Sequence, residues 1–298
     1  MYGKIVPLAF GFALAASTAT PVPVSAETAP HIWAQHCEEW DDWDKPAPPF
    51  RIHGNSYYVG TCGITSILIT GEEGHILIDS GTVAGAEVVL ANIETLGFDP
   101  LEVKLLLFSH EHHDHVGGMA RLIEATGAPL LASVDSAGVM TSGLLDARDP
   151  QKDIHDAMAP VSVSGLIVKD TPLTLGSLSV TPVPTPGHTP GATSWTWKSC
   201  DDAGECLGIA YADSLSATSA DDYRFSDHPD YVARFRVGLN ALAAIERCDI
   251  FLNPHPSFGD LRNKILAGDL TGGVDCAEHA HRMTARLEAR LAQESETE

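Results

Sequence analysis

The chain has 298 residues, and its 18 lysines and arginines against 40 aspartates and glutamates give a formal net charge of −22 at pH 7. A surface this acidic repels phosphate backbones, which argues against nucleic acid as a partner or substrate. The length is sufficient for one large domain with a substantial hydrophobic core.

The N-terminal 26 residues have the pattern of a secretory signal peptide. Lys4 is their only charged residue, residues 5–16 are apolar, and residues 24–26 (VSA) fit a cleavage site with small side chains. The apolar run is short for a bilayer span, which favours cleavage over the alternative, an uncleaved membrane anchor. We therefore predict a periplasmic protein with a single domain at 27–298 that has no membrane contact after cleavage.

Hydrophobic patterning predicts a run of strands followed by a helix in each half of the mature chain. In the first half we expect strands at 51–60, 64–70, 76–78, 103–108 and 129–133, and helices at 83–96 and 119–125. In the second half we expect strands at 166–168, 173–183, 193–198, 207–212 and 250–252, and helices at 229–245 and 276–293. This order predicts an α/β fold in which two β-sheets pack together and helices cover their outer faces.

Residues 135–161 differ from the rest of the chain. They are rich in Asp, Gly, Ser and Pro, and their apolar residues are isolated. A segment of this length without periodicity is more often functional or mobile than part of a core. We expect it to form a flap over the site, with a plain surface excursion as the alternative.

A histidine-rich motif directly follows the apolar strand at 103–108. Residues 110–115 read HEHHDH, an H-x-H-x-D-H pattern, and two glycines at 117–118 let the chain turn tightly after it. The four potential ligands of this loop therefore sit at the end of a buried strand. Imidazole and carboxylate groups both bind zinc, so the loop can hold two metal ions side by side.

Two further histidines occur in loops that follow expected strands. His188 lies in the turn-rich string PGHTPG after 173–183, and His255 lies in NPHP after 250–252. A lone H-x-H is weak evidence, because many histidines are structural. Three such motifs at strand ends strengthen the prediction of a metal site. Three imidazoles on one zinc leave a coordination position for water, as a catalytic zinc requires.

The six cysteines of an exported chain indicate disulfide bonds. Cys200 and Cys206 flank the string DDAGE, which is typical of a hairpin tip, so we expect them to pair with each other. The pairing of the other four stays open at this point, and free thiols are the alternative. No cysteines have the C-x-x-C spacing, which argues against a thiolate zinc site.

The H-x-H-x-D-H motif together with His188 and His255 resembles the metallo-β-lactamase superfamily. The strings SHEHHDHVGG, TPGHTPGATSW, YADSLSA, CDIFLNPHP and FRIHGNSYYVGTCGI are similar to subclass B3 of that superfamily. The resemblance covers nearly all of the mature chain. It implies the αβ/βα sandwich, in which two mixed β-sheets pack together with helices on the outer faces.

The resemblance also implies zinc-dependent hydrolysis of the β-lactam amide bond, and hence resistance to β-lactam antibiotics, with two Zn²⁺ per monomer. A hydroxide that bridges the two zinc ions would attack the carbonyl, and Asp114 would orient it as the catalytic carboxylate. The implied ligands are His110, His112 and His188 for the first zinc, and Asp114, His115 and His255 for the second. Two zinc ions about 3.5–4 Å apart can lower the pKa of a bound water to about 7.

Supporting residues follow from the same resemblance. Ser214 and Ser216 would hold the carboxylate of the substrate, although two serines in a turn can also be ordinary loop residues. Asp79 would support the metal loops without binding metal. We expect a monomer whose partners are small β-lactam molecules. The implied disulfides are Cys37–Cys62, Cys200–Cys206 and Cys248–Cys276.

Asp213 leaves an alternative open. In thioesterase-type relatives an aspartate in this loop bridges both metals, which would displace Ser214 from its substrate role. The alternative function is therefore that of a thioesterase or lactonase similar to glyoxalase II. A third hypothesis, a non-catalytic metal-binding protein, is disfavoured because the ligand set is complete.

Overall fold

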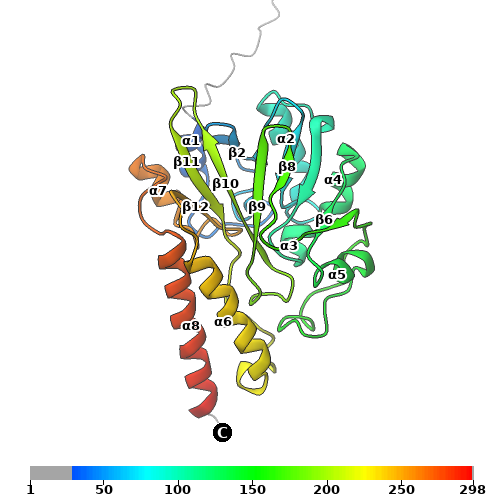
Figure 1. Ribbon diagram of the computed structural model, residues 1–298, viewed down its shortest axis with the longest axis vertical. Helices are drawn as coiled ribbons and strands as arrows, with labels where there is room; N and C mark the ends of the chain where they lie inside the picture. Colours follow the sequence, from blue (N-terminus) through cyan, green and yellow to red (C-terminus); the bar gives the residue numbers. More distant parts are fainter. Residues whose placement is uncertain (1–28, 297–298) are drawn as a thin grey trace, which may run out of the picture.

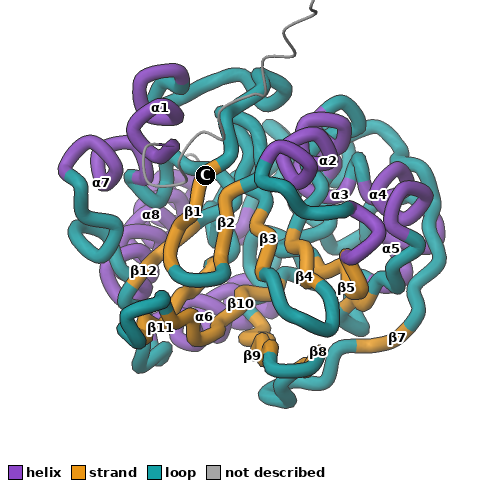
Figure 2. Tube along the Cα trace, turned by 90° about the horizontal axis from the view of Figure 1, so that it is seen from above, coloured by secondary structure: helices purple, strands orange, loops and turns teal. Residues whose placement is uncertain are grey.

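The computed structural model describes residues 29–296, which form two β-sheets with helices on the outside (Figure 1). The expected signal peptide, residues 1–26, lies outside the described residues. Within residues 29–296, no helix combines the length and the apolar character needed to span a membrane. Seen from above, the first sheet forms a row from β1 to β5, and α2 and α4 lie on its side away from the second sheet (Figure 2).

The first sheet has the strand order β1-β2-β3-β4-β5. Its strands are β1 (Phe50–His53), β2 (Ser56–Tyr58), β3 (Ile67–Ile69), β4 (His75–Ile78) and β5 (Val103–Leu107). Neighbouring strands are antiparallel except for the parallel pair β4 and β5. The expectation of one strand over 51–60 is wrong, because the chain turns at Gly54. The φ angle of Gly54 is +52°, a left-handed conformation that glycine adopts without steric cost.

The second sheet has the order β12-β11-β10-β9-β8. Its strands are β8 (Leu173–Leu175), β9 (Leu178–Pro184), β10 (Thr193–Cys200), β11 (Cys206–Tyr211) and β12 (Ile250–Leu252). Only β11 and β12 run parallel among its neighbouring strands. The expected single strand at 173–183 is also wrong. Gly176, with a φ angle of +56°, turns the chain into the β8–β9 hairpin.

Helices cover both outer faces, as expected. Helix α2 (Gly85–Thr95) and helix α4 (Met119–Thr126) pack apolar side chains on the first sheet. Helix α6 (Pro229–Ala243) and the long helix α8 (Cys276–Glu296) pack on the second. The expected helices at these four places are therefore confirmed, apart from small shifts at their ends.

The strands expected at 129–133 and 166–168 correspond to β6 (Leu131–Ala132) and β7 (Gly165–Leu166), which form a separate two-stranded parallel sheet. Several other short elements were not expected from the sequence. They are α1 (Ala29–His36), α3 (His113–Val116), α5 (Ala137–Ser142), α7 (Leu261–Ala267) and the 3₁₀ turns Pro100–Glu102 and Phe225–Asp227. These elements are too short for a clear hydrophobic period, which is why patterning did not reveal them.

The main core lies between the two sheets. Ile67 and Ile76 from the first sheet join Trp195 and Tyr211 from the second in one buried cluster. Strands β3 and β4 are buried along their whole length, because the second sheet covers one face and helices cover the other. The architecture is that of an αβ/βα sandwich, which confirms the expected fold class.

The three expected disulfides are present, and the described residues include no free cysteine. Cys37–Cys62 joins the segment after α1 to the segment before β3. Cys200–Cys206 closes the hairpin of β10 and β11, and Cys248–Cys276 ties the start of β12 to α8. Each bond contributes typically about 2–4 kcal/mol by restricting the unfolded chain.

Candidate metal centre

The loops that carry the expected ligands converge at one edge of the two sheets. The histidine-rich motif follows β5, His188 follows β9, Ser214 follows β11 and His255 follows β12. Strand β5 is parallel to β4, and β12 is parallel to β11, so the carboxyl ends of each pair fall on the same side. The convergence therefore follows from the sheet topology.

His110, His112 and His188 form the first cluster. Each offers a ring nitrogen, and these three atoms lie within 4.8 Å of one another. All three side chains are buried. Burial and the neighbouring His112 lower the pKa of His188 to about 3, and burial with the surrounding histidines holds the pKa of His110 well below its ordinary value. His110 and His188 are therefore neutral at pH 7 and can offer lone pairs to a cation.

Asp114, His115 and His255 form the second cluster beside the first. The ring centroids of His110 and His115 are 4.1 Å apart. Oδ2 of Asp114 lies 3.0 Å from Nε2 of His115 and 3.5 Å from Nε2 of His255. Burial alone would lower the pKa of His115, but the carboxylates of Asp114 and Asp79 outweigh it and raise this pKa to about 10. A cation bound here would take the place of the imidazolium proton.

Buried polar atoms in these clusters lack partners, which tests whether the site fits a metal. Within residues 29–296, Nε2 of His110 makes no hydrogen bond, and both ring nitrogens of His115 face the carboxylates of Asp114 and Asp79 without hydrogen-bonding geometry. Nearly all buried polar groups in proteins are satisfied, so such atoms need an explanation. Imidazole and carboxylate groups at this spacing are ligands for a divalent transition metal such as zinc. The residues present therefore fit a metal centre.

Asp79 lies next to His115 of the second cluster and next to the residue that precedes the histidine motif. It follows β4, is fully buried, and lies 3.4 Å from Nδ1 of His115. Its carboxylate accepts hydrogen bonds from the backbone N–H of Ser109 at 2.6 Å, from Ser109 Oγ at 2.8 Å and from Tyr211 Oη at 2.6 Å. These hydrogen bonds fix Ser109, which immediately precedes the histidine motif, so Asp79 lies where a residue that supports this loop is expected.

Asp213 contacts a histidine of the first cluster. Its Oδ1 lies 2.9 Å from Nδ1 of His110, and its Oδ2 accepts the backbone N–H of Leu215 at 3.0 Å. Burial raises the pKa of Asp213 to about 7. This contact involves Nδ1 of His110, whereas Nε2 is the ring nitrogen that makes no hydrogen bond among the described residues. Oδ1 of Asp213 makes no hydrogen bond of suitable geometry among the described residues, and the hydrogen bond of Nδ1 of His110 is with Ser109 Oγ at 3.2 Å. Asp213 thus lies close behind His110 without holding it through a hydrogen bond.

Ser214 and Ser216 lie beside the clusters but differ in their contacts. Oγ of Ser214 is buried without a hydrogen-bond partner among the described residues, while its backbone carbonyl accepts a hydrogen bond from Nε2 of His279 at 3.1 Å. Oγ and the carbonyl oxygen of Ser216 lie 3.0 and 3.1 Å from Nδ1 of His188. Ser216 thus contacts His188 through two oxygen atoms, whereas the hydroxyl of Ser214 makes no contact of this kind among the described residues.

Comparison with known proteins agrees with this geometry. Residues 59–202 match the family model of the metallo-beta-lactamase superfamily. The chain is 46% identical to the solved metallo-β-lactamase MIM-1 from Novosphingobium pentaromativorans, with a TM-score of 0.86 over 89% of this chain and 98% of that one. This chain belongs to the metallo-β-lactamase superfamily.

Other relatives indicate the subclass of metallo-β-lactamases that this chain is most similar to. It is 48% identical to MIM-2, with a TM-score of 0.82, over 91% of this chain and 98% of that chain. It is 37% identical to MEM-A1, a subclass B3 enzyme from a soil metagenome library, with a TM-score of 0.81, over 86% of this chain and all of that one. Its structural neighbours are thus subclass B3 metallo-β-lactamases. It is also 25% identical to the probable metallo-hydrolase YqgX of Bacillus subtilis, over 52% of this chain and 65% of that protein.

The flap of this metallo-β-lactamase reaches the metal centre, which sequence analysis expected without naming a contact. Asp149 is buried, and its Oδ2 lies 3.0 Å from Nε2 of His112. Nε2 of Gln151 lies 3.4 Å from Nε2 of His188, and the ring of His155 lies 4.8 Å from that of His112. These residues sit in a loop without periodicity, so no sequence signal identified them.

Glu111 is a second functional residue that sequence analysis missed. It lies between two expected ligands, yet its side chain is fully buried and points away from solvent. It accepts hydrogen bonds from Thr189 Oγ1 and from the backbone N–H of Gly191, both at 2.9 Å. Burial raises its pKa to about 7. Glu111 therefore ties the histidine motif to the loop of His188. An acidic residue inside a ligand motif was the available signal.

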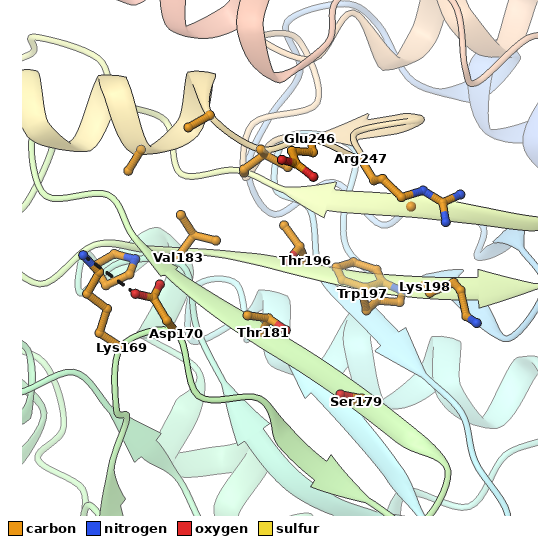
Figure 3. Close-up of a pocket in the computed structure, with 15 residues that line it drawn as sticks. Lys169, Asp170, Ser179, Thr181, Val183, Thr196, Trp197, Lys198, Glu246 and Arg247 are labelled. Atoms are coloured by element: carbon orange, nitrogen blue, oxygen red, sulfur yellow. Dashed lines mark ion pairs between the residues drawn. The ribbon is translucent and has the colours of Figure 1, made fainter.

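Two grooves differ in their relation to the metal centre. One of about 660 Å³ opens beside His113, with Trp43, Val83 and Ile154 among its walls. Another of about 690 Å³ lies on the outer face of the second sheet, where Lys169, Lys198 and Arg247 are spread along it (Figure 3). No histidine lines the second groove, so it is separate from the metal centre. His113 and His155 line the first groove, whereas none of the six expected metal ligands does.

Proposed function

We propose that this protein hydrolyses the amide bond of β-lactams with two zinc ions per monomer. The observation that carries the proposal is the convergence of two ligand clusters, His110, His112 and His188 beside Asp114, His115 and His255, at one edge of the sandwich. The relatives that match nearly end to end support it, because they are metallo-β-lactamases at up to 48% identity.

The first cluster would hold one zinc ion and the second cluster the other. Zinc in these sites would supply a water nucleophile at neutral pH and polarise the carbonyl of the substrate. Asp114 lies between the histidines of the second cluster, so its carboxylate can accept a hydrogen bond from the attacking water and orient it. Asp79 and Asp213 lie close to His115 and His110, at 3.4 and 2.9 Å, and would support these rings when metal is bound.

Ser214 supports a substrate that carries a carboxylate. Its buried hydroxyl has no hydrogen-bond partner among the described residues, so it can donate to an anionic oxygen without breaking an existing bond. Ser216 would assist from its place two residues along the same loop and through its hydroxyl, which already contacts Nδ1 of His188. A carboxylate next to the scissile amide is a feature of penicillins, cephalosporins and carbapenems.

Export to the periplasm is part of the same proposal. The three disulfides are supporting evidence, because disulfides persist in oxidising compartments. The pattern of residues 1–26 is the other support. The fusion of this N-terminal segment to a reporter enzyme should direct the reporter to the periplasm, and a cytoplasmic reporter would contradict this part of the proposal.

The experiment that tests the function compares substrate classes on the purified protein. We expect hydrolysis of nitrocefin and of a carbapenem to be faster than hydrolysis of acyl thioesters or homoserine lactones. The thioesterase hypothesis requires Asp213 to bridge two metals, whereas its Oδ1 lies against Nδ1 of His110. Faster turnover of a thioester or lactone than of any β-lactam would overturn the proposal.

A further inference from the structure

The flap contributes one buried carboxylate to the first metal cluster. Asp149 lies in the loop between α5 and β7, and only 1% of its surface is exposed. Its Oδ2 lies 3.0 Å from Nε2 of His112 in hydrogen-bonding geometry, and its Oδ1 accepts the backbone N–H of Gln151 at 2.7 Å. Both oxygens of the carboxylate are therefore engaged, one with a ligand histidine and the other with the flap itself.

This contact determines which nitrogen of His112 can bind a metal. A neutral imidazole has one N–H and one lone pair, and a carboxylate accepts a hydrogen bond but cannot donate one. Nε2 of His112 must therefore carry the proton that Asp149 accepts, which leaves the lone pair on Nδ1. An imidazole held in the other tautomer would present a proton to the cation.

We infer that Asp149 is a positioning residue of the first metal site, and that through it the flap contributes to zinc affinity. Asp149 selects the tautomer and the ring orientation of His112 before metal binds. Because the same carboxylate accepts the backbone N–H of Gln151, this selection depends on the flap holding the position that the structure shows. Coupling of this kind is reciprocal, so bound zinc should in turn stabilise the flap.

The base of the flap is held independently of the metal cluster. One guanidinium nitrogen of Arg148 donates to Oδ1 of Asp135 at 2.9 Å, and Arg234 of α6 donates to Oδ2 of the same carboxylate at 2.9 Å. Arg148 immediately precedes Asp149 in the chain. The Asp135 carboxylate and its two arginines thus anchor the chain directly before Asp149.

Asp149→Asn is the sharpest test, because asparagine has nearly the shape of aspartate. An asparagine side chain has one acceptor oxygen and one NH₂ group, so it cannot accept from both His112 and Gln151. In one case, the backbone N–H of Gln151 loses its acceptor. In the other case, the NH₂ group of the asparagine donates to Nε2 of His112, and the ring proton of His112 moves to Nδ1. Asp153→Asn, at an exposed residue of the same flap, is the matched control.

Zinc affinity is measured on metal-free protein by competition with a chromophoric chelator. We expect Asp149→Asn to weaken zinc binding by roughly 10–100-fold, as is typical for partners of metal-binding histidines, and Asp153→Asn to leave it unchanged. In metal-free protein, the ¹⁵N NMR signals of the His112 ring should show the proton on Nε2 in the wild type and a loss of this preference in the variant. Zinc should also slow hydrogen exchange of the flap amides in the wild type more than in the variant.

The inference rests on the proposed metal centre, not on the identity of the substrate. If the wild type binds no zinc, the proposed function and this inference both fail. If the wild type binds zinc and Asp149→Asn binds it equally tightly, only this inference is overturned. A proton on Nδ1 of His112 in the wild type would overturn it as well, even if the variant folds poorly.

Discussion

Tyr211 donates a hydrogen bond to Asp79 from one sheet to the other, with 2.6 Å between its Oη and Oδ2 of the carboxylate. Tyr211 is the last residue of β11, and Asp79 directly follows β4. Burial and the charge of Asp79 raise the pKa of Tyr211 well above its ordinary value, so the phenol stays a donor. Asp79 in turn holds Ser109, the residue before the histidine motif. The packing of the two sheets is thereby linked to the position of the metal loop.

The first prediction is that Tyr211→Phe lowers the free energy of unfolding of the metal-free protein by about 1.5–3 kcal/mol, the range for a hydrogen bond to a charged group. Urea denaturation measures it. Tyr231→Phe is the matched control, because Tyr231 Oη donates to the neutral carbonyl of Gly187 at 3.0 Å. The control should lose only about 0.5–1.5 kcal/mol. Equal losses in the two variants would contradict the special role of Asp79.

The second prediction concerns Asp114. Asp114→Asn removes the negative charge that lies 3.0 Å from His115 and 3.5 Å from His255. We expect turnover of β-lactams to fall on the order of 100-fold or more, and the second zinc to bind more weakly than the first. Steady-state kinetics and metal counting after dialysis measure both effects. Glu124→Gln, at an exposed residue of α4, should change neither. Near-wild-type kinetics with two bound zinc ions would refute the role given to Asp114.

The third prediction separates binding from chemistry at Ser214. The contact with the substrate carboxylate would exist in the ground state and in the transition state alike. Ser214→Ala should therefore raise KM while kcat changes little. Kinetics with several β-lactams measure the split between the two constants. An unchanged KM for all of them would remove Ser214 from the substrate site.

The fourth prediction is a pH dependence that arises at His279. Burial, and to a smaller extent Arg286 and Arg282, lower its pKa from 6.5 to about 4, while its Nε2 donates to the carbonyl of Ser214. The unfolded chain takes up a proton at this histidine near pH 6.5, but the folded protein does so only near pH 4. Stability from this group is therefore complete above pH 6.5 and is lost as the pH falls toward 4.

His279→Gln keeps a donor near the position of Nε2 and removes the titration. From pH 7 to pH 4, the wild type should lose up to about 3 kcal/mol more unfolding free energy than the variant, since one pKa unit corresponds to about 1.4 kcal/mol. Urea denaturation of metal-free protein across this range measures the difference. Parallel stability curves for the two proteins would show that His279 does not titrate in this way.

The proposed ligands could be picked out from the sequence because each follows a strand whose apolar pattern is clear. His110, His112 and His115 lie in one motif, and His188 and His255 lie in turns rich in proline and glycine. Parallel pairing of β4 with β5 and of β11 with β12 then brings these loops to one edge. Hydrophobic patterning predicted the strands but not which strands pair. The prediction that the ligand-bearing loops meet at one site therefore rested on the family resemblance.

What escaped prediction depends on contacts between distant residues. Asp149 and His112 are 37 residues apart and meet only because the flap folds back over the motif. The hairpin turns at Gly54 and Gly176 were missed for a different reason. Both glycines interrupt runs of β-prone residues, so hydrophobic alternation alone merges two strands into one. Positive φ at these glycines is what divides the strands.

A zinc titration of the metal-free protein, with hydrolysis of a carbapenem as the readout, decides whether the two clusters form a catalytic centre. The two ligand clusters predict that turnover rises with added zinc, levels off at two equivalents per chain, and is abolished by a chelator. A penicillin and a cephalosporin should be tested in parallel. Turnover that survives removal of the metal, or no turnover of any of the three substrates with two zinc ions bound, would contradict the account.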